Sequence, residues 1–355
     1  MKEDKLSILY VGPLQPGGTC LQRLKALQFL GHDITGVDTV PSAVEKGSRS
    51  LIQRIITRFF GPRDFAETNE SIIQLIKNKS FDILWIDKGL IIKPKTISAA
   101  KELYPAIKLI SYSPDDMLNP HNQSKYYLDC IPLYDVHITT KSYNVAELRQ
   151  LGAQKVLFLD NAFCPFTHRP QKVSEKGRKF LGGPVGFIGT FEEDRAQQLA
   201  YLAQRGIDVK VWGNWPRKLR NKYPKLQVME NGLWDLDYAK AICSFDINLC
   251  FLRKGMRDLQ TTRSIEIPAC GGFMLAERTH EHLKLFKEGK EAAFFESREE
   301  LLYNVNYYLR HDQERNRIAA AGRKRCIESG YSNNERLNDI INIIKNLFIN
   351  SETAN

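Results

Sequence analysis

Apolar runs of strand length alternate along the chain with segments whose apolar residues recur at helical spacing. A stretch rich in Pro, Gly and Lys separates two series of these runs. The first series comprises residues 6–12, 32–38, 81–87, 108–113, 136–140 and 155–160, and the second comprises residues 184–191, 207–213, 226–230, 245–252 and 271–277. Strands that alternate with helices are typical of parallel sheets with helices on both faces. The pattern therefore predicts an α/β protein with two such sheets.

Each series opens with a strand followed by a glycine-containing turn and a helix. GPLQPGGT (residues 12–19) follows the first strand, and GTFEEDR (residues 189–195) follows the strand that opens the second series. This is the arrangement of doubly wound Rossmann-like domains, although the two halves share no sequence repeat. We predict an N-terminal domain over residues 1–168, a second domain over 169–332, and a C-terminal helix over 333–355 that packs back across the first domain.

The composition agrees with a two-domain globular protein. A chain of 355 residues is longer than one core normally fills, and 43% hydrophobic with 26% charged residues is ordinary. No apolar run approaches the ~20 residues that cross a bilayer, and the N-terminus lacks the apolar core of a signal peptide. We expect a cytoplasmic protein. Its seven cysteines lack CxxC spacing, which predicts buried, reduced thiols.

Basic residues outnumber acidic ones by 51 to 41, and the net charge of +10 favours anionic partners. Nucleic acid is disfavoured, because no zinc-finger spacing, RNP-type motif or helix-turn-helix is recognisable. The segment from Arg49 to Phe60 repeats apolar residues at helical spacing, with its arginines largely off the apolar stripe. Two interpretations stay open: a basic amphipathic helix that contacts an anionic membrane or an acceptor, and a helix packed on its own sheet.

The stretch DLQTTRSIEIPACGG (residues 258–272) combines two carboxylates with good helix-capping residues. Thr261, Thr262 and Ser264 precede Glu266, so we expect a helix to begin here with its backbone N–H groups available to an anion such as a diphosphate. Asp258 and Glu266 flank that point and can accept hydrogen bonds from ribose and sugar hydroxyls. The alternative is a helix that merely carries acids on its way into a sheet.

RSIEIPACGGFMLAER (residues 263–278), the helical segments that follow it, and residues 113–153 resemble the CgeB-like, spore-maturation-type glycosyltransferases, relatives of the group-1 GT-B enzymes. The likeness covers most of the chain. It implies the GT-B fold, in which two Rossmann-like doubly wound domains face an interdomain cleft and bind the acceptor and the donor respectively. It also implies a nucleotide-sugar donor, but fold analogy does not supply the substrate.

The resemblance implies donor-binding roles for particular residues. Glu266 stands where the family's acid accepts from the ribose hydroxyls, and Asp258, one methylene shorter than the usual Glu, stands where the other acid acts on the donor sugar. Arg195 follows Gly189 at the six-residue spacing of a diphosphate-binding cation. Thr190 replaces the Arg that usually follows the glycine, so half of the usual phosphate clamp must come from elsewhere.

Three cations are candidate substitutes for that arginine: Arg253, Lys254 and Arg263. A guanidinium grips phosphate through a bidentate fork, whereas a solvated surface charge is the alternative for Arg253 and Lys254. The same resemblance places the nucleobase edge against the backbone of residues 229–232, which end at Gly232. Uridine is the default base.

On the acceptor side, Asp115 and Asp116 follow the predicted strand at residues 108–113, at the sheet edge where open α/β folds build their sites. Either carboxylate is a candidate general base for an inverting transfer, and a plain Pro-Asp-Asp turn is the alternative. A retaining enzyme would need no such base. The other candidates on this side are His121 and the loop residues Gly17, Gly18 and Thr19.

These observations together predict a metal-independent GT-B glycosyltransferase of hexosyltransferase type. Its donor is a nucleoside diphosphate sugar, with a UDP-sugar as the default. Its acceptor is a hydroxyl of a cell-surface glycan or glycoconjugate, so the expected partner is a glycan, a lipid-linked or a protein acceptor. The DLD motif at residues 235–237 lies at a predicted helix entry, so Arg, Lys and a helix dipole are the expected leaving-group stabilisers. Two alternatives stay open: an epimerase or phosphorylase on the same fold, and a non-catalytic nucleotide-sugar-binding scaffold.

Overall fold

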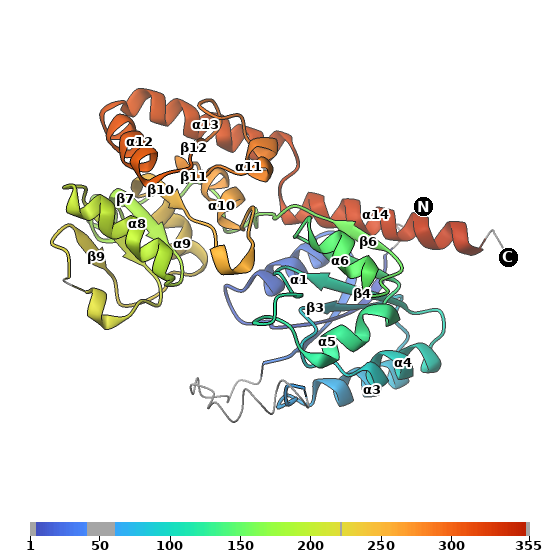
Figure 1. Ribbon diagram of the computed structural model, residues 1–355. Helices are drawn as coiled ribbons and strands as arrows, with labels where there is room; N and C mark the ends of the chain where they lie inside the picture. Colours follow the sequence, from blue (N-terminus) through green and yellow to red (C-terminus); the bar gives the residue numbers. More distant parts are fainter. Residues whose placement is uncertain (1–4, 41–60, 221, 353–355) are drawn as a thin grey trace. The chain divides into compact units, whose positions relative to one another are not determined.

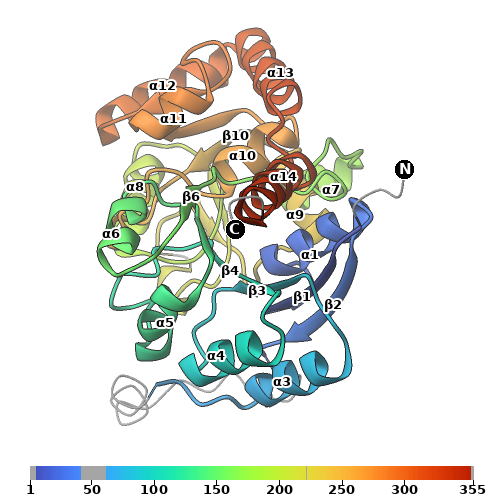
Figure 2. The same ribbon diagram turned by 90° about the vertical axis from the view of Figure 1, so that its right-hand side faces the viewer.

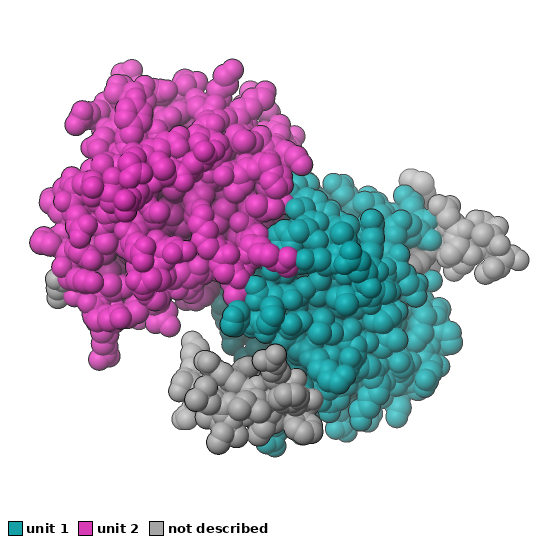
Figure 3. Space-filling model, in the orientation of Figure 1, with its two compact units in different colours: residues 1–160, 334–355 teal, residues 161–333 magenta. Residues whose placement is uncertain are grey.

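The computed structural model describes residues 5–40, 61–220 and 222–352, and the chain divides into two compact units (Figure 3). Unit 1 comprises residues 1–160 and 334–355, and unit 2 comprises residues 161–333. The division falls after Asp160 rather than after residue 168. The reason is local: Asn161 donates its N–H to the side chain of Gln260, and Phe163 donates its N–H to Tyr331, both in unit 2.

Unit 1 is built on a six-stranded parallel sheet of order β2-β1-β3-β4-β5-β6 (Figure 1). Its strands are β1 (Ser7–Gly12), β2 (Asp33–Asp38), β3 (Ile83–Asp87), β4 (Lys108–Ser113), β5 (Val136–Thr139) and β6 (Val156–Phe158). Its helices are α1 (Thr19–Phe29), α3 (Thr68–Asn78), α4 (Pro94–Leu103), α5 (Lys125–Cys130), α6 (Asn144–Gln150) and α14 (Asn333–Glu352), with a 3-10 turn at Ile131–Leu133.

Alternate residues of the central strands of unit 1 point to opposite faces, and each face has its own core. Ile8, Tyr10 and Trp85 pack with Leu24 and Leu27 of α1 on one face. The buried residues of α14 complete this core, and they are Leu337, Ile340, Ile341 and Ile344. The opposite face is covered by α3 and α4 (Figure 2). The last helix of the chain is therefore part of the first unit.

Unit 2 contains a second six-stranded parallel sheet, of order β12-β11-β10-β7-β8-β9. Its strands are β7 (Gly183–Ile188), β8 (Val209–Trp212), β9 (Leu226–Val228), β10 (Phe245–Cys250), β11 (Met274–Glu277) and β12 (Ala293–Phe295). Its helices are α7 (Glu175–Leu181), α8 (Glu193–Gln204), α9 (Asp235–Ile242), α10 (Arg263–Ala269), α11 (His280–Leu285), α12 (Arg298–Arg310) and α13 (Asp312–Glu328), with 3-10 turns at Arg217–Leu219 and Lys254–Met256.

Both faces of the unit 2 sheet are covered by helices. On one face, α8, α12 and α13 pack over Val185, Phe187 and Leu249. On the other, α9, α10 and α11 pack over Ile188, Cys250 and the strands beside them. The predicted fold class, two doubly wound α/β sheets, is confirmed, and β12 is the strand that the sequence pattern did not predict.

The segment from Arg49 to Phe60 and the seven cysteines were also the subject of predictions. The amphipathic segment from Arg49 to Phe60 lies outside the described residues. All seven cysteines lie within them, six buried and Cys243 half-buried, and each is a free thiol. Within the described part of the chain, no helix combines the length and the apolar composition that crossing a membrane requires.

Candidate functional site

The strand order of unit 2 reverses between β7 and β10, which are neighbours in the sheet. From β7 the chain proceeds to β8 and β9 on one side, and then returns to β10 on the other side. Open α/β sheets bind ligands at such a reversal, because the loops that leave the two strands diverge there. The segments that follow β7 and β10 carry most of the predicted donor residues, including Gly189, Arg195, Arg253 and Asp258.

Two guanidinium groups converge at this point. Nη2 of Arg195 and Nη2 of Arg263 both donate to the carbonyl oxygen of Phe251, at 3.4 and 3.2 Å. Both groups also lie over the ring of Phe187, with Cζ 5.5 and 5.6 Å from its centroid. Burial and the neighbouring Arg263 lower the pKa of Arg195 to about 10. Two cations held this close in a buried place favour an anion between or beside them.

Carboxylates balance part of this charge. Glu192 lies 3.6 Å from Nη1 of Arg195, and burial raises the pKa of Glu192. Arg253 donates from Nε to Asp258 at 3.2 Å, and the Asp258 side chain is only 2% exposed. Asp258 therefore holds Arg253 in place at the edge of the cluster. We use the name arginine cluster for Arg195, Arg253 and Arg263.

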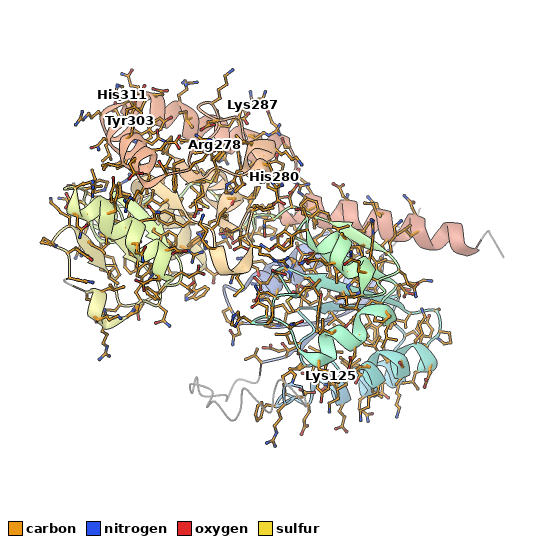
Figure 4. The ribbon with its side chains drawn as sticks, viewed as in Figure 1. Lys125, Arg278, His280, Lys287, Tyr303 and His311 are labelled. Carbon is orange, nitrogen blue, oxygen red and sulfur yellow. The ribbon has the colours of Figure 1, made fainter. Side chains whose placement is uncertain are left out.

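Lys254 has a carboxylate partner of its own outside the arginine cluster. Its amine is exposed and pairs with Glu277 at the end of β11, and Glu277 also accepts the N–H of Leu252. Arg278, labelled in Figure 4, is likewise engaged, because it forms ion pairs with Glu288 and Glu300 at 2.6 and 2.7 Å. No carboxylate among the described residues forms an ion pair with Arg263. Arg263 is therefore the best candidate for the missing half of the phosphate clamp.

Gly189 leaves room for the Phe187 ring and the Arg263 guanidinium. A Cβ atom at this position would lie 2.8 Å from Cζ of Phe187 and 3.5 Å from Nη1 of Arg263. Its carbonyl accepts from Nε1 of Trp215 at 2.8 Å, and its N–H donates to Trp212. A side chain here would therefore displace the ring on which the two guanidinium groups rest. Thr190, next in sequence, is exposed.

The N–H groups at the start of α10, which the sequence predicted to bind an anion, are hydrogen-bonded within the chain. The first four N–H groups of α10 all have acceptors within the chain: Arg263 donates to Oγ1 of Thr261, Ser264 to the Thr261 carbonyl, and Ile265 and Glu266 to the Thr262 carbonyl. The side chain of Thr262 makes no cap. Thr261 and Thr262 accept hydrogen bonds from the N–H groups that an anion was expected to contact. The positive charge available to an anion in unit 2 is therefore that of the arginine cluster.

Glu266 is buried and held by a phenol. Tyr238 on α9 donates its hydroxyl to Oε2 of Glu266 at 2.7 Å. Burial and the carboxylate raise the pKa of Tyr238, so the hydroxyl stays protonated. Nε2 of His168 lies 3.8 Å from Oε1, and Nδ1 of His168 accepts the Cys164 N–H at 3.0 Å. The Nδ1 bond places the imidazole proton on Nε2, facing Glu266.

Tyr238 and His168 were not found from the sequence. Tyr238 lies 28 positions before Glu266, and no motif connects them. Gly232 lies in the loop between β9 and α9, where its Cβ position is 3.6 Å from Nε1 of Trp234. Part of the backbone of that loop is used internally, since Met229 donates to Val211 and Asn231 accepts from Gly213.

Unit 1 has its own reversal of strand order, between β1 and β3. Asp87 at the end of β3 is buried and accepts from Tyr10 at 2.6 Å and from Nε of Arg23 at 2.8 Å. The guanidinium of Arg23 lies 4.4 Å from the centroid of the Tyr112 ring. Gly12 makes room for this pair, because a Cβ there would lie 3.0 Å from Cβ of Asp87.

The two predicted acids of unit 1 differ in their environment. Asp115 pairs with Lys88 at 2.9 Å, and both side chains are partly exposed. Partial burial opposes the charge of Lys88, but the neighbouring Asp115 raises its pKa. Lys88 has a φ of 70°, a left-handed conformation that costs a non-glycine residue about 1 kcal/mol. Asp116 is fully buried and accepts from Asn144 at 3.1 Å, which indicates a structural role.

The remaining predicted residues of unit 1 lie in loops near these groups in the sequence. Gly17 has a φ of 76°, and Gly18 precedes α1, which begins at Thr19. His121 is exposed, and its N–H donates to the side chain of Asn119. The pair Asp87-Lys88 was missed, although it follows a buried strand in the same way as Asp115. The rule that selected Asp115 would also have found it.

Comparison with known proteins identifies the fold. A glycosyltransferase from Rickettsia africae aligns over 97% of this chain and 99% of its own, with 14% identity and a TM-score of 0.66. Anabaena HepE, solved in complex with UDP and glucose, aligns over 95% and 99% with 13% identity and a TM-score of 0.63. The sucrose-phosphate synthase of Thermosynechococcus elongatus aligns over 97% of this chain and 99% of its own, with 12% identity and a TM-score of 0.65. The fold is GT-B.

The sequence comparisons add a family match within this GT-B chain. Residues 195–342 match a family model described as Glycosyl transferase-like. The match begins at Arg195 and includes the rest of the arginine cluster together with Asp258, Tyr238 and Glu266. A search of curated protein sequences finds no match to the chain.

Proposed function

We propose that this GT-B protein is a glycosyltransferase that moves a sugar from a UDP-sugar to an acceptor hydroxyl of a glycan, a lipid-linked or a protein acceptor. The observation that carries the proposal is the convergence of Arg195 and Arg263 on one carbonyl at the strand reversal of unit 2. Anabaena HepE, which has the same fold, was solved in complex with UDP and glucose. The family match over residues 195–342 points to the same reaction class.

The arginine cluster fits the chemistry of such a transfer. When the bond between the anomeric carbon and the diphosphate oxygen breaks, negative charge grows on the leaving diphosphate. Guanidinium groups fixed in a buried place stabilise that charge, and their planar forks match phosphate oxygens. Arg195 and Arg263 are held by Phe251 and Phe187, so little reorganisation is needed at the moment of reaction. We propose that this cluster stabilises the leaving group without a metal ion.

Glu266 is proposed to bind the ribose of the donor. A carboxylate can accept two hydroxyl hydrogen bonds, and Tyr238 already orients one of its oxygens. Asp258 is proposed to act through Arg253, since its buried carboxylate is engaged by that guanidinium. Its predicted direct role on the donor sugar is therefore less favoured.

On the acceptor side, Asp115 is the preferred candidate for the general base of an inverting transfer. Its side chain is partly exposed, and its carboxylate lies 2.9 Å from Nζ of Lys88. Asp116 is the weaker candidate because its carboxylate is buried against Asn144. His121 stays a candidate contact to the acceptor.

The donor class can be tested by thermal shift with UDP, GDP, dTDP, CDP and ADP. A ligand at one hundred times its Kd adds about 2.7 kcal/mol to the free energy of unfolding, which a melting curve resolves. We expect a shift with UDP that Glu266→Ala reduces. No shift with any nucleotide would remove the donor site from unit 2.

Turnover then separates the alternatives. A transferase releases UDP faster when an acceptor is added, or hydrolyses the donor slowly without one. An epimerase converts one nucleotide-sugar into another with no acceptor, and a phosphorylase requires phosphate. A binding scaffold shifts the melting temperature with UDP and releases nothing. Only the first outcome supports the proposed function.

A further inference from the structure

Trp234 is the exposed tryptophan of a chain that otherwise buries this residue type. The protein has four tryptophans. Trp85, Trp212 and Trp215 are at most 5% exposed, whereas Trp234 is 67% exposed. An indole has the largest apolar surface of any side chain, and leaving it in water gives up burial that folding would otherwise gain. Such a residue is a candidate for contact with a ligand or partner.

The backbone fixes where this indole stands. Trp234 is the residue that precedes α9, and Asp235 directly after it has a φ of 49°. A left-handed aspartate costs roughly 1 kcal/mol, and such strain is retained where the surroundings require one chain direction. The Cβ position of Gly232 lies 3.6 to 3.7 Å from three atoms of the indole. The ring therefore rests on the loop between β9 and α9, with no side chain of residue 232 beneath it.

Trp234 is connected through Tyr238 to Glu266, and this connection suggests what the exposed indole binds. Tyr238 follows Trp234 by four positions, and its N–H donates to the Trp234 carbonyl at 3.3 Å. This bond closes the first turn of α9, so Trp234, its N-cap residue, stands about one turn or 5.4 Å before Tyr238 along the helix axis. The Tyr238 hydroxyl binds Glu266, the proposed ribose ligand. A base attached to that ribose would lie within reach of a group one helical turn away.

We propose that Trp234 is the stacking surface for the nucleobase of the donor. The inference rests on the proposed function, because it takes Glu266 as the ribose ligand. Stacking accepts any base face, so it supplies affinity and leaves discrimination among bases to the loop backbone. On the scale of base stacking on aromatic side chains, removal of the indole weakens nucleotide binding on the order of tenfold to a hundredfold.

Tryptophan fluorescence provides a direct test with the full-length protein. Because the other three indoles are buried, UDP that stacks on Trp234 should quench the exposed, red-shifted part of the emission. In Trp234→Phe this quenching should be lost. Calorimetry should show a UDP affinity on the order of tenfold or more lower for Trp234→Ala, with a smaller loss for Trp234→Phe, which retains an aromatic face.

Inorganic pyrophosphate separates the contribution of the nucleobase from that of the diphosphate. It has the charge of the diphosphate but no base, so its affinity should be the same in Trp234→Ala and in the unaltered protein. Tyr303→Ala is the matched control, since Tyr303 is also 67% exposed and lies on α12 (Figure 4). This control should leave the affinities for UDP and pyrophosphate unchanged.

The outcomes separate this inference from the proposed function. If UDP binds and Trp234→Ala keeps full affinity with no quenching, the stacking role is overturned while the donor site stands. Equal losses for UDP and pyrophosphate would mean that the substitution perturbs the whole site, which also overturns it. A blue shift with anionic phospholipid vesicles, without any response to UDP, would assign the indole to a membrane surface instead. If no nucleotide binds, both proposals fail.

Discussion

At the scale of single residues, the candidate donor site is defined by charges that repel one another. Arg195 is 2% exposed, Arg263 donates to the same carbonyl, and Glu192 balances only part of their charge, so an anion beside them would be favoured. Arg278 shows the contrast, because its carboxylate partners compensate a similar charge within the protein. Arg263, a cation without a carboxylate partner at the strand reversal, is better explained by a ligand than by stability.

Arg263→Ala should therefore weaken UDP binding without lowering the melting temperature of the free protein. Loss of a charge-assisted hydrogen bond costs about 1.5 to 3 kcal/mol, which is roughly ten- to more than a hundredfold in Kd. Relief of the repulsion with Arg195 offsets the lost contact to Phe251. Calorimetry and melting curves measure the two effects. Arg317→Ala, on an exposed arginine of α13, is the control, and an unchanged UDP affinity in Arg263→Ala would contradict the phosphate role.

Tyr238→Phe tests whether the phenol orients Glu266 for the ribose. The variant removes the hydroxyl that donates to Oε2 of Glu266, so the carboxylate is held less firmly. We therefore expect UDP to bind several-fold more weakly. Pyrophosphate, which lacks ribose, should bind as before. If both ligands weaken equally, Tyr238 supports the fold of the site rather than the ribose contact.

The residues that sequence analysis found and those it missed differ in how far apart their partners lie. The spacing from Gly189 to Arg195 is local, and Asp258 and Glu266 stand in one short motif, so family resemblance located them. The partners of Arg23 and Tyr238 lie 64 and 28 positions away. Only the order of the strands brings such residues together. For the same reason, nothing in the Thr-rich motif revealed that its own threonines cap the N–H groups of α10.

At the scale of elements, a histidine on α11 supports the first turn of α10, which carries Arg263. Nδ1 of His282 donates to the Glu277 carbonyl at 2.6 Å, so Nε2 accepts from Ser264 at 2.7 Å. Ser264 in turn accepts the Thr261 N–H. Burial lowers the pKa of His282 to about 4. This chain of bonds requires the neutral imidazole, and a second proton on His282 would break it.

The stability of unit 2 should consequently decrease as the pH is lowered. The folded pKa of His282, about 4, lies below the value of about 6.5 expected in the unfolded chain. Below pH 6.5 the unfolded chain therefore binds a proton that the folded chain does not. The free energy of unfolding is lost at about 1.4 kcal/mol per pH unit until pH approaches 4.

Urea unfolding at pH 7 and pH 5 measures this loss. In His282→Asn the difference between the two pH values should shrink by about 2 kcal/mol, even though the variant is less stable at both. His280→Asn is the control, because His280 is exposed on the same helix (Figure 4). An unchanged difference in His282→Asn would show that this imidazole does not resist protonation.

The last helix offers a second test at this scale. Ile340 is 2% exposed in the core of unit 1, whereas Ile343 on the same helix is 41% exposed. Ile340→Ala should lower the free energy of unfolding by about 2 to 5 kcal/mol through lost burial and a cavity. Ile343→Ala should change it by less than about 1 kcal/mol. Equal effects of the two substitutions would mean that α14 does not pack on the sheet through this face.

Elements with clear periodicity were predictable, and short ones were not. The alternation in the central strands and the apolar stripe at residues 337, 340, 341 and 344 are visible in the sequence and correspond to β1, β3 and α14. β12 spans only Ala293–Phe295, too few residues for a period to appear. The unit boundary was placed late because the Pro-rich stretch after Asp160 reads as a linker, although its first residues are bonded into unit 2.

At the scale of the whole molecule, the two units carry different groups at equivalent places. Each sheet reverses its strand order once, and each reversal gathers charged side chains. Those of unit 2 include three arginines that suit a diphosphate. Those of unit 1 form two ion pairs, Arg23 with Asp87 and Lys88 with Asp115, which leave little net charge. Paired charges of this kind suit the hydroxyl groups of a neutral acceptor better than another phosphate.

This difference predicts that donor affinity and turnover can be separated by mutation. Asp115→Asn removes the proposed base, and general-base catalysis typically contributes a factor of about 100 to 10,000. We expect kcat to fall within that range while the Kd for UDP changes less than about twofold, because the proposed donor ligands belong to unit 2. Asp129→Asn is the control, since Asp129 also pairs with a lysine, Lys125, on the exposed surface of unit 1 (Figure 4). Full activity in Asp115→Asn would exclude the base and favour a retaining reaction. A large loss of UDP affinity would instead show that the two units do not divide donor and acceptor binding between them.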